Sequence, residues 1–391
     1  MQRYIILSAS VIMQMCLGAT YSWSVYVQPL KESTGLLQGP VQLPFTLFYF
    51  AFPFTMIFSG QWLPRLGPRR CAVAGGLIFG CGWLVAGWGH VHFGLTVLGV
   101  GLLAGIGVGL AYIVPIATCI RWFPDHKGLV TGIAVAGFGG GAALVSQIGA
   151  WLMNVHGATP FETFRLLGIA FMVLVAAAGW CMQNPPGAYL AAGRSLPWRQ
   201  IVAQPRFRIL YLAMVCGLAA GFAVNANLKE LYVGGGLTAG VTAVGAFAIA
   251  NATGRIVWGW CFDRFKGQGA VSVNLVMQAA VLILSPWILV SEAGLLLFAV
   301  LTGFNYGGVL VLYASNVAHI WGPPAVGQIY GLLFSANIPA ALAPLAAGLI
   351  FDATGSFVPA LTGIAILMVV AAMLFRTTVR QEQLTPFSEK S

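Results

Sequence analysis

The stretch NATGRIVWGWCFDRFKG, residues 251–267, places one cation, Arg255, inside a run of apolar residues. Asn251 precedes Arg255 by four residues, so the two side chains share one face of a helix. A guanidinium group binds a carboxylate through two parallel hydrogen bonds, and arginine keeps its charge in proteins. The spacing therefore predicts an anion site in which Arg255 holds a carboxylate and Asn251 donates to the same group or to a neighbouring hydroxyl.

Other kinds of chemistry find little support in the sequence. The glycine run 99–109 lacks the lysine of a phosphate-binding loop, and inside an apolar segment it favours close helix approach instead. No nucleophile–base motif and no metal-binding pattern is present. The cysteines form no CxxC pair and are interpreted as packing residues: Cys16, Cys71, Cys81, Cys119, Cys181, Cys216 and Cys261. We expect no enzymatic activity, no metal and no cofactor.

The composition indicates an integral membrane protein. Of 391 residues 59% are hydrophobic and only 7% are charged, whereas soluble domains carry about 25% charged residues. The net charge of +10 would suggest nucleic acid in a soluble protein, but basic residues also gather in the cytoplasmic loops of membrane proteins. We therefore expect no nucleic-acid partner, and membrane lipid as the surroundings.

Apolar runs long enough to cross a bilayer, roughly 20 residues each, position the predicted site. They predict an all-α membrane protein with twelve transmembrane helices near 4–30, 42–64, 71–90, 94–120, 128–154, 163–183, 206–228, 236–262, 269–290, 293–318, 325–350 and 357–377.

The basic residues give the predicted topology. Fifteen of the nineteen fall on one face, in four loops and the two termini. The positive-inside rule then predicts a multi-pass protein of the cell (inner) membrane with both termini in the cytoplasm. Three more basic residues fall on the opposite face, and the remaining one is Arg255. An arginine at the centre of a span costs about 2.5–3.5 kcal/mol, so it requires a wet cavity or an anion. The alternative is that Arg255 extends to the cytoplasmic edge near Asp263.

An internal repeat divides the chain. An offset of 199 residues aligns Gly60 with Gly259, Gly128 with Gly327, and Gly132 with Gly331. The repeat predicts two pseudo-symmetric six-helix halves, 1–183 and 206–391, joined by a cytoplasmic linker at 184–205.

Several stretches resemble the major facilitator superfamily. GQWLPRLGPRR (60–70) is similar to its loop motif between spans two and three, and GWCFDRFKG (259–267) is similar to the copy in the second half. LGATYSWSVYVQPL (17–30) and RWFPDHKGLVTGIAVAGFGGG (121–141) resemble the oxalate/formate antiporter family and the related monocarboxylate porters. The resemblance implies the major facilitator fold.

The resemblance also implies a substrate site near the bilayer middle, between the halves. It places there, besides Arg255 and Asn251, the candidates Tyr21, Tyr112, Asn305, Tyr306, Phe334 and Asn337. Tyrosine hydroxyls would share the carboxylate or a substrate hydroxyl, and the rings would enclose an apolar tail. Ordinary packing is the alternative for each aromatic residue.

The two loop motifs imply a gate on the cytoplasmic side. Its predicted residues are Arg65, Arg69, Arg70, Asp263 and Arg264. Pro64 stands where the first motif of the family has aspartate, so the resemblance is weaker in this copy.

One cation favours a substrate with one carboxylate, because the second charge of a dicarboxylate would remain poorly compensated. Oxalate exchangers of the resembled family have a lysine in span eleven, which 325–350 lacks. The sequence thus predicts a monomeric secondary transporter of a small monocarboxylate, lactate or pyruvate, working by alternating access.

Three alternatives concern coupling and function class. The resemblance places proton-linked uptake first, with a proton as second partner. However, Asn251 replaces the aspartate of proton-linked relatives, which favours anion exchange of the formate/oxalate type. A receptor that binds an organic acid without transporting it is an alternative of a different class.

Overall fold

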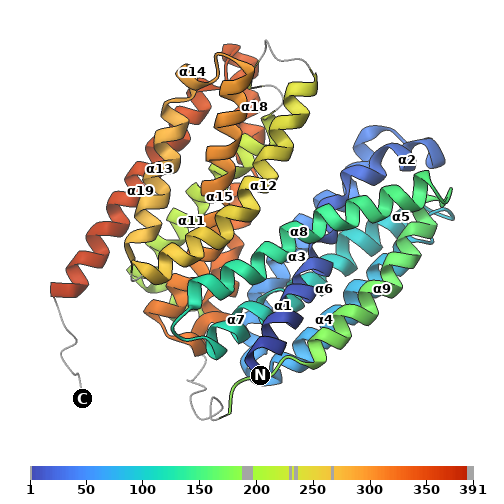
Figure 1. Ribbon diagram of the computed structural model, residues 1–391, viewed down its shortest axis with the longest axis horizontal. Coiled ribbons are helices and arrows are strands. Elements are labelled where there is room, and N and C mark those ends of the chain that lie inside the picture. The colour runs from blue at the N-terminus through green and yellow to red at the C-terminus, as the bar shows by residue number, and fades with distance from the viewer. Residues whose placement is uncertain (1, 187–196, 229–230, 233–236, 266–267, 385–391) are drawn as a thin grey trace. The chain divides into compact units, whose positions relative to one another are not determined.

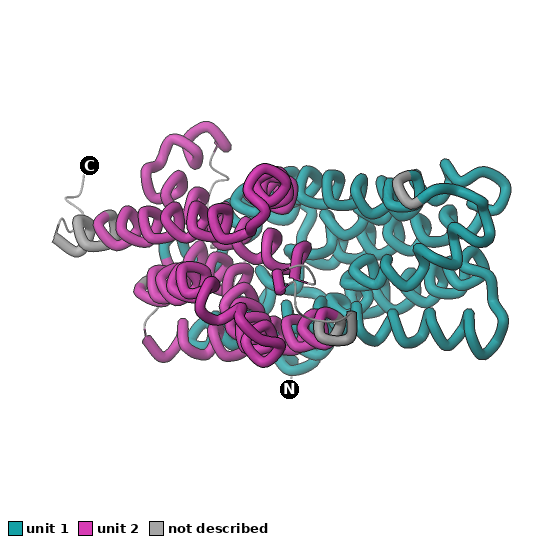
Figure 2. The backbone as a smooth tube through the Cα atoms, turned by 90° about the horizontal axis from the view of Figure 1, so that it is seen from above, with its two compact units in different colours: residues 1–195, 320–335 teal, residues 196–319, 336–391 magenta. Residues whose placement is uncertain are grey.

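The computed structural model describes residues 2–186, 197–228, 231–232, 237–265 and 268–384. These residues form helices, and no β-strand occurs among them. The chain divides into two compact units, one of residues 1–195 with 320–335 and the other of residues 196–319 with 336–391 (Figures 1 and 2). We call them unit 1 and unit 2 and describe each by itself.

Unit 1 contains the first half of the chain and a short segment from far along it. Its helices are α1 (Gln2–Leu17), η1 (Gly18–Ser22), α2 (Ser24–Thr34), α3 (Gln38–Leu66), α4 (Pro68–Ala86), α5 (Gly94–Thr96), η2 (Val97–Leu103), α6 (Ala104–Ala111), α7 (Ile113–Trp122), α8 (Lys127–Asn154), α9 (Pro160–Trp180), η4 (Pro323–Ala325) and α16 (Val326–Leu333).

Unit 2 contains the remaining helices. They are α10 (Trp198–Ala203), α11 (Pro205–Asn227), α12 (Leu237–Arg264), α13 (Gln268–Ile283), α14 (Ser285–Ile288), α15 (Glu292–Ile320), α17 (Asn337–Ala340), α18 (Ala343–Thr354) and α19 (Val358–Leu384). The turn η5 (Phe334–Ala336) carries the chain from unit 1 into unit 2.

The helices confirm the prediction of an all-α membrane protein. In the described part of the chain, ten helical segments are long and apolar enough to cross a membrane, and each corresponds to a predicted span. The other two predicted spans, 236–262 and 269–290, coincide with α12 and with α13 followed by α14. The boundaries of the two halves remain a prediction, and linker residues 187–196 lie outside the described residues.

Four predicted spans are interrupted in the described part of the chain: the first, the fourth at Tyr112 between α6 and α7, the ninth between α13 and α14, and the eleventh. The first divides at η1, between α1 and α2, and the eleventh divides at η5 and α17, between α16 and α18. In the eleventh, Pro339 and Pro344 lack the N–H that a continuous helix needs. Tyr21, Phe334 and Asn337, all predicted site residues, lie at these interruptions.

The glycine run of the fourth span lets three helices approach closely, as predicted. This span begins with α5 and the π-helical segment η2 and continues as α6. A Cβ added at Gly99 or Gly107 would collide with the backbone of α4, and one at Gly105 or Gly109 would press on α3. The run therefore packs on two neighbours at once, because glycine alternates between two sides of the helix.

Aromatic side chains of α4 and α9 pack with Trp23 in the core of unit 1. Trp23 stacks on Phe164 with ring centroids 5.9 Å apart, and Phe164 meets Trp83 at 5.5 Å. Both tryptophans are buried, and the indole of Trp23 donates to the carbonyl of Val41 at 3.2 Å. Trp23 is therefore a structural residue, although only two positions separate it from the predicted site residue Tyr21.

Candidate functional site

Arg255 lies on a buried stripe of α12. The stripe repeats every three or four residues, and its members are all at most 9% exposed: Phe247, Asn251, Arg255, Trp258 and Phe262. Arg255 itself is 7% exposed. A cation at this position costs free energy unless its hydrogen bonds are satisfied and its charge is compensated.

Asn251 orients the Arg255 side chain. Arg255 Nε donates to Asn251 Oδ1 at 3.0 Å. Because Asn251 is four residues earlier, the guanidinium is directed away from Asp263 and the end of α12. This direction is opposite to the one that a side chain extending to that end would take. The sequence assigned no role to the Asn251 side-chain oxygen, which accepts this hydrogen bond from Arg255. The N–H groups of the Asn251 amide are the donors that we predicted would bind the substrate.

The turn that carries Arg255 lies against the backbone of α15. A Cβ at Gly307 would collide with the carbonyl oxygen of Asn251 and would lie 2.9 Å from the backbone nitrogen of Arg255. Gly254 is equally close to the carbonyl of Phe304 on α15. Gly254 on α12 and Gly307 on α15 therefore let the two backbones approach closely, and this close approach sets the distance between the Arg255 turn and α15.

The other predicted substrate-binding residues of unit 2 are Tyr306, Asn305 and Asn337. The ring of Tyr306 is half-buried, lies against the backbone of Gly221 and stands 5.9 Å from the ring of Phe247. Phe247 therefore contacts Tyr306 and also belongs to the buried stripe that carries Arg255.

Asn305, one residue earlier, faces the contact between α13 and α15. Its carbonyl accepts a hydrogen bond from Asn274 Nδ2 at 2.9 Å, and the residue is 2% exposed. Asn337 is half-buried and begins the short α17. This bond is made by the backbone carbonyl of Asn305, whose buried side-chain Oδ1 has no hydrogen-bond partner among the described residues. Asn337 occupies the interruption of the eleventh span.

Three predicted residues of unit 1 meet in one aromatic cluster. The Tyr112 ring lies 5.3 Å from Phe138 and 5.3 Å from Phe334, and Tyr21 lies 5.1 Å from Phe138. Phe52 completes the cluster at 5.2 Å from Tyr112 and 5.0 Å from Phe334. Tyr112 and Phe334 are buried, whereas Tyr21 is 40% exposed.

Local backbone geometry brings these rings together. Tyr112 occupies the break between α6 and α7, where Gln14 of α1 donates to its carbonyl at 3.2 Å. Gly18 allows η1 to lie directly on the backbone of Phe138 in α8. The cluster is thus assembled at irregular points of the first and fourth spans.

Phe52 and Phe138 of this cluster were not predicted from the sequence. Phe138 lies within the glycine-rich AGFGGG segment, which contributed to the family resemblance but did not indicate a site residue. Phe52 is one of many phenylalanines in α3. Since these spans are apolar on all faces, their hydropathy pattern does not distinguish one ring from another.

The predicted gate residues lie at helix ends. Arg65 falls in the last turn of α3, and Gly67, with φ of 81°, begins the turn into α4. Arg69 stacks its guanidinium 4.7 Å from the Trp180 ring at the end of α9. Arg65, Arg69 and Arg70 are exposed. Helix α3 continues through Pro64.

In unit 2, Asp263 and Arg264 form the end of α12. Asp263 is half-buried and Arg264 is exposed. Their predicted role as a gate stays a prediction. No group of three metal-ligating side chains occurs in the described ranges.

Comparison with known proteins gives consistent results. A model of the Major Facilitator Superfamily matches residues 8–338. The chain is 27% identical over 350 residues to the oxalate:formate antiporter of Oxalobacter formigenes, covering 87% of this chain and 82% of that protein. It is 24% identical over 377 residues to monocarboxylate transporter 13 of Rattus norvegicus, covering 90% and 83%.

The fold matches a solved transporter structure. FucP in the outward conformation superposes with a TM-score of 0.74 at 13% sequence identity, covering 96% of this chain and 99% of that chain. At this identity the likeness concerns the fold alone.

Proposed function

Because the chain belongs to the Major Facilitator Superfamily, we propose that it is a secondary active transporter of small monocarboxylates such as lactate or pyruvate. The observation that carries this proposal is the Arg255–Asn251 pair on the buried stripe of α12. It supplies one fixed positive charge, and a monocarboxylate supplies the one negative charge that neutralises it. The similarity to monocarboxylate transporter 13 supports the same class of substrate.

The geometry of the pair favours a contact in which the two terminal nitrogens of Arg255 bind the carboxylate. Asn251 engages Nε, so the two terminal nitrogens form the fork that would face a carboxylate. A dicarboxylate would leave its second charge without a cation in 325–350, where the sequence has no lysine or arginine. This argument favours lactate and pyruvate over oxalate.

Uptake into proteoliposomes tests the proposal. Wild-type protein should accumulate radiolabelled lactate, and Arg255→Ala should reduce uptake to the background of empty liposomes. Arg376→Ala, at an exposed position of α19, is the matched control and should retain uptake. Full uptake by Arg255→Ala would contradict the assignment of Arg255 as the carboxylate site.

Coupling to a proton is our first candidate, because the sequence resembles proton-linked monocarboxylate porters. Anion exchange is the second candidate, and one observation favours it. Arg255 keeps its charge when the substrate leaves, and the amide of Asn251 that accepts from its Nε has no titratable proton to exchange as the substrate enters or leaves. A substrate carboxylate brings one negative charge to this cation, so reorientation of the loaded carrier moves less net positive charge through the membrane than reorientation of the empty one.

A pH gradient distinguishes the two candidates. Symport predicts that an inward proton gradient drives lactate accumulation into liposomes that contain no substrate. Exchange predicts uptake only when the liposomes are preloaded with a carboxylate, with no response to the gradient. Uptake in either of these two experiments excludes a receptor that binds an organic acid without transporting it.

A further inference from the structure

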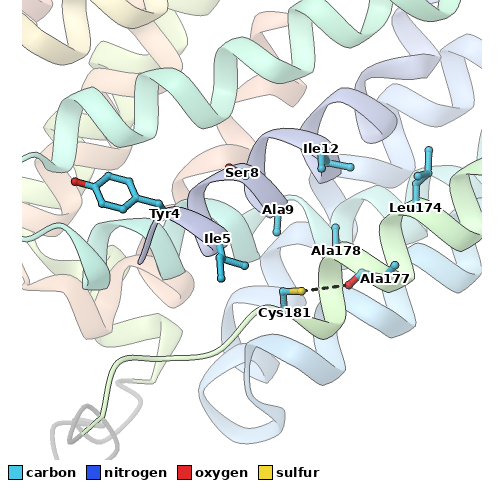
Figure 3. A pocket seen from close by; sticks show the side chains of 9 residues that line it. All are labelled: Tyr4, Ile5, Ser8, Ala9, Ile12, Leu174, Ala177, Ala178 and Cys181. Carbon is cyan, nitrogen blue, oxygen red and sulfur yellow. Dashed lines mark hydrogen bonds between the residues drawn. The ribbon is translucent and has the colours of Figure 1, made fainter. Parts of the chain in front are cut away.

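A groove on unit 1 lies outside the candidate site. It runs along the outer surface between α1 and α9, has a volume of about 550 Å³, and is lined almost entirely by apolar side chains (Figure 3). Small residues of both helices are part of its lining, Ser8 and Ala9 on α1 and Ala177 and Ala178 on α9, and we call these four its floor. The groove exists because two pairs of small residues stand where most positions of these helices carry bulky ones.

The length of the groove matches one leaflet of a bilayer. It extends from Tyr4 to Ile12 on α1 and from Cys181 to Leu174 on α9. Eight residues of helix span roughly 12 Å, and one leaflet contributes about half of the 30 Å hydrocarbon core. The groove begins near the ends of both predicted spans, so a lipid chain that enters there would stay within a single leaflet.

A cation lies beside Tyr4, the lining residue nearest the start of α1, whose ring points away from α9 (Figure 3). Arg3 Nη2 donates to Tyr4 Oη at 3.2 Å, and its guanidinium lies 5.0 Å from the Tyr4 ring and 5.6 Å from the Phe123 ring. Arg3 is exposed. Guanidinium groups bind phosphate through paired hydrogen bonds, and two rings that hold the group reduce the entropy lost on binding.

We propose that this groove binds one acyl chain of an anionic phospholipid, whose phosphate contacts Arg3. The small floor residues receive the chain, Tyr4 marks the level of the interface, where tyrosine is enriched in membrane proteins, and Arg3 selects the headgroup. Zwitterionic lipids of the same chain length fill the groove without this selection, because their headgroup carries a compensating positive charge.

Native mass spectrometry of the delipidated full-length protein tests the site. Phosphatidylglycerol and phosphatidylcholine with identical chains are titrated separately. Wild type should bind one phosphatidylglycerol with about fivefold preference over phosphatidylcholine, the effect expected of one cation near an anionic lipid. Arg3→Gln should remove this preference and retain binding, whereas Lys31→Gln should behave as wild type.

Filling the groove provides an independent test. Ala177 is exposed, so Ala177→Phe occupies the floor without entering the protein core, and Ser8→Leu does the same from α1. Both should lose the first bound lipid of either kind. Val173→Phe, on the same helix at an exposed position outside the groove, should keep it.

Two results would overturn the proposal. The first is equal binding of the two lipids by wild type, which would indicate adventitious lipid or detergent only. The second is an unchanged first adduct in both groove-filling variants. Circular dichroism and size-exclusion profiles identical to wild type establish that each variant is folded.

Discussion

Arg255 and Asn251 form a hydrogen-bonded pair in which Arg255 carries the positive charge and Asn251 orients the guanidinium group. A hydrogen bond to a charged group contributes about 1.5–3 kcal/mol, and here it is made at Nε rather than at the terminal nitrogens. If Arg255 binds the carboxylate as proposed, this arrangement requires arginine at position 255. Lysine has one ammonium point and cannot bond Asn251 through one atom while presenting a planar fork through two others.

Arg255→Lys should therefore fail although it preserves the charge. We expect lactate affinity to fall about 10- to 100-fold, the loss that corresponds to one charge-assisted hydrogen bond. Isothermal titration of purified protein measures it, with Arg376→Lys as the control. An unchanged affinity would mean that charge alone suffices and that the fork has no role.

Asn251→Asp should make binding depend on pH. The introduced carboxylate would replace the amide at 3.0 Å from Arg255 Nε and would compete with the substrate for the guanidinium. Arg255 keeps this carboxylate ionised in the empty site, whereas an arriving lactate anion favours its protonation, so binding takes up a proton and affinity should rise as pH falls from 8 to 5. We expect at least about tenfold weaker lactate binding at pH 8, a difference typical of a buried charge competitor.

The wild-type protein is the control for this titration. Lactate itself stays ionised across the range, so wild-type affinity should change little between pH 8 and pH 5. A variant whose affinity follows the wild-type curve would show that the residue at 251 does not reach the substrate-binding end of Arg255.

The sequence singled out Arg255 because a charge in an apolar run is conspicuous, and it placed Asn251 on the same face by helical spacing. It also predicted Tyr21, Tyr112 and Phe334, which the structure brings into one cluster. Phe52 and Phe138 escaped prediction because ring-to-ring contacts depend on helix rotation. In a span that is apolar on every side, no pattern of residues records that rotation.

At the scale of elements, close helix contacts position the site. Helices α12 and α15 meet through Gly254, Gly303 and Gly307, each of which would place a Cβ on the opposing backbone. The carbonyl of Asn251 lies at this contact, so the spacing of the two helices determines where the Arg255 turn sits. Abundant glycine predicted close approach from sequence, but which glycine meets which helix required the structure.

Gly307→Ala should therefore impair binding without altering any group that contacts the substrate. The added methyl would force α15 away from the Arg255 turn, and overpacking of this kind costs about 1–3 kcal/mol. We expect a lower melting temperature and about tenfold weaker lactate binding. Thermal unfolding and titration measure the two effects.

Gly245→Ala is the matched control on α12 itself, because a Cβ there would meet nothing within 4 Å. It should leave lactate affinity unchanged and raise stability slightly, since alanine favours helix over glycine by up to about 1 kcal/mol. If both variants bind lactate equally well, the α12–α15 contact does not determine the geometry of the site.

The interruptions of the spans were the elements that the sequence described least well. Uninterrupted hydropathy across 4–30 and 325–350 predicted continuous helices, whereas η1 and η5 divide them. Hydropathy reports where the chain is apolar, and a 3-10 turn is as apolar as an α-helix. Pro339 and Pro344 were the available signal in the eleventh span. In the first span, Gly18 was the corresponding signal, because it allows η1 to reach α8.

At the scale of the whole molecule, sequence and contacts assign one segment differently. Residues 320–335 belong to the second half by sequence, but they pack within unit 1. A Cβ at Gly60 of α3 would collide with the carbonyl of Gly327 on α16, and Arg121 Nη2 donates to the carbonyl of Pro324 at 3.3 Å. If the halves rock against each other during transport, this crossing of α3 and α16 is a contact that must form and separate.

Gly331→Leu should consequently reduce transport more than binding. A Cβ at Gly331 would lie 2.7 Å from the carbonyl oxygen of Met56 and 3.2 Å from Gly60 Cα, so the larger side chain would prevent α3 and α16 from closing. Arg255 is in unit 2 and outside this crossing. We expect lactate counterflow to fall at least about tenfold while the dissociation constant changes less than about threefold, because a conformational step limits turnover in many enzymes.

Gly348→Leu is the control, because nothing lies within 4 Å of a Cβ added there, and it should preserve both counterflow and the dissociation constant. A parallel loss of binding and counterflow in Gly331→Leu would instead indicate that the crossing supports the fold of the site and not its movement.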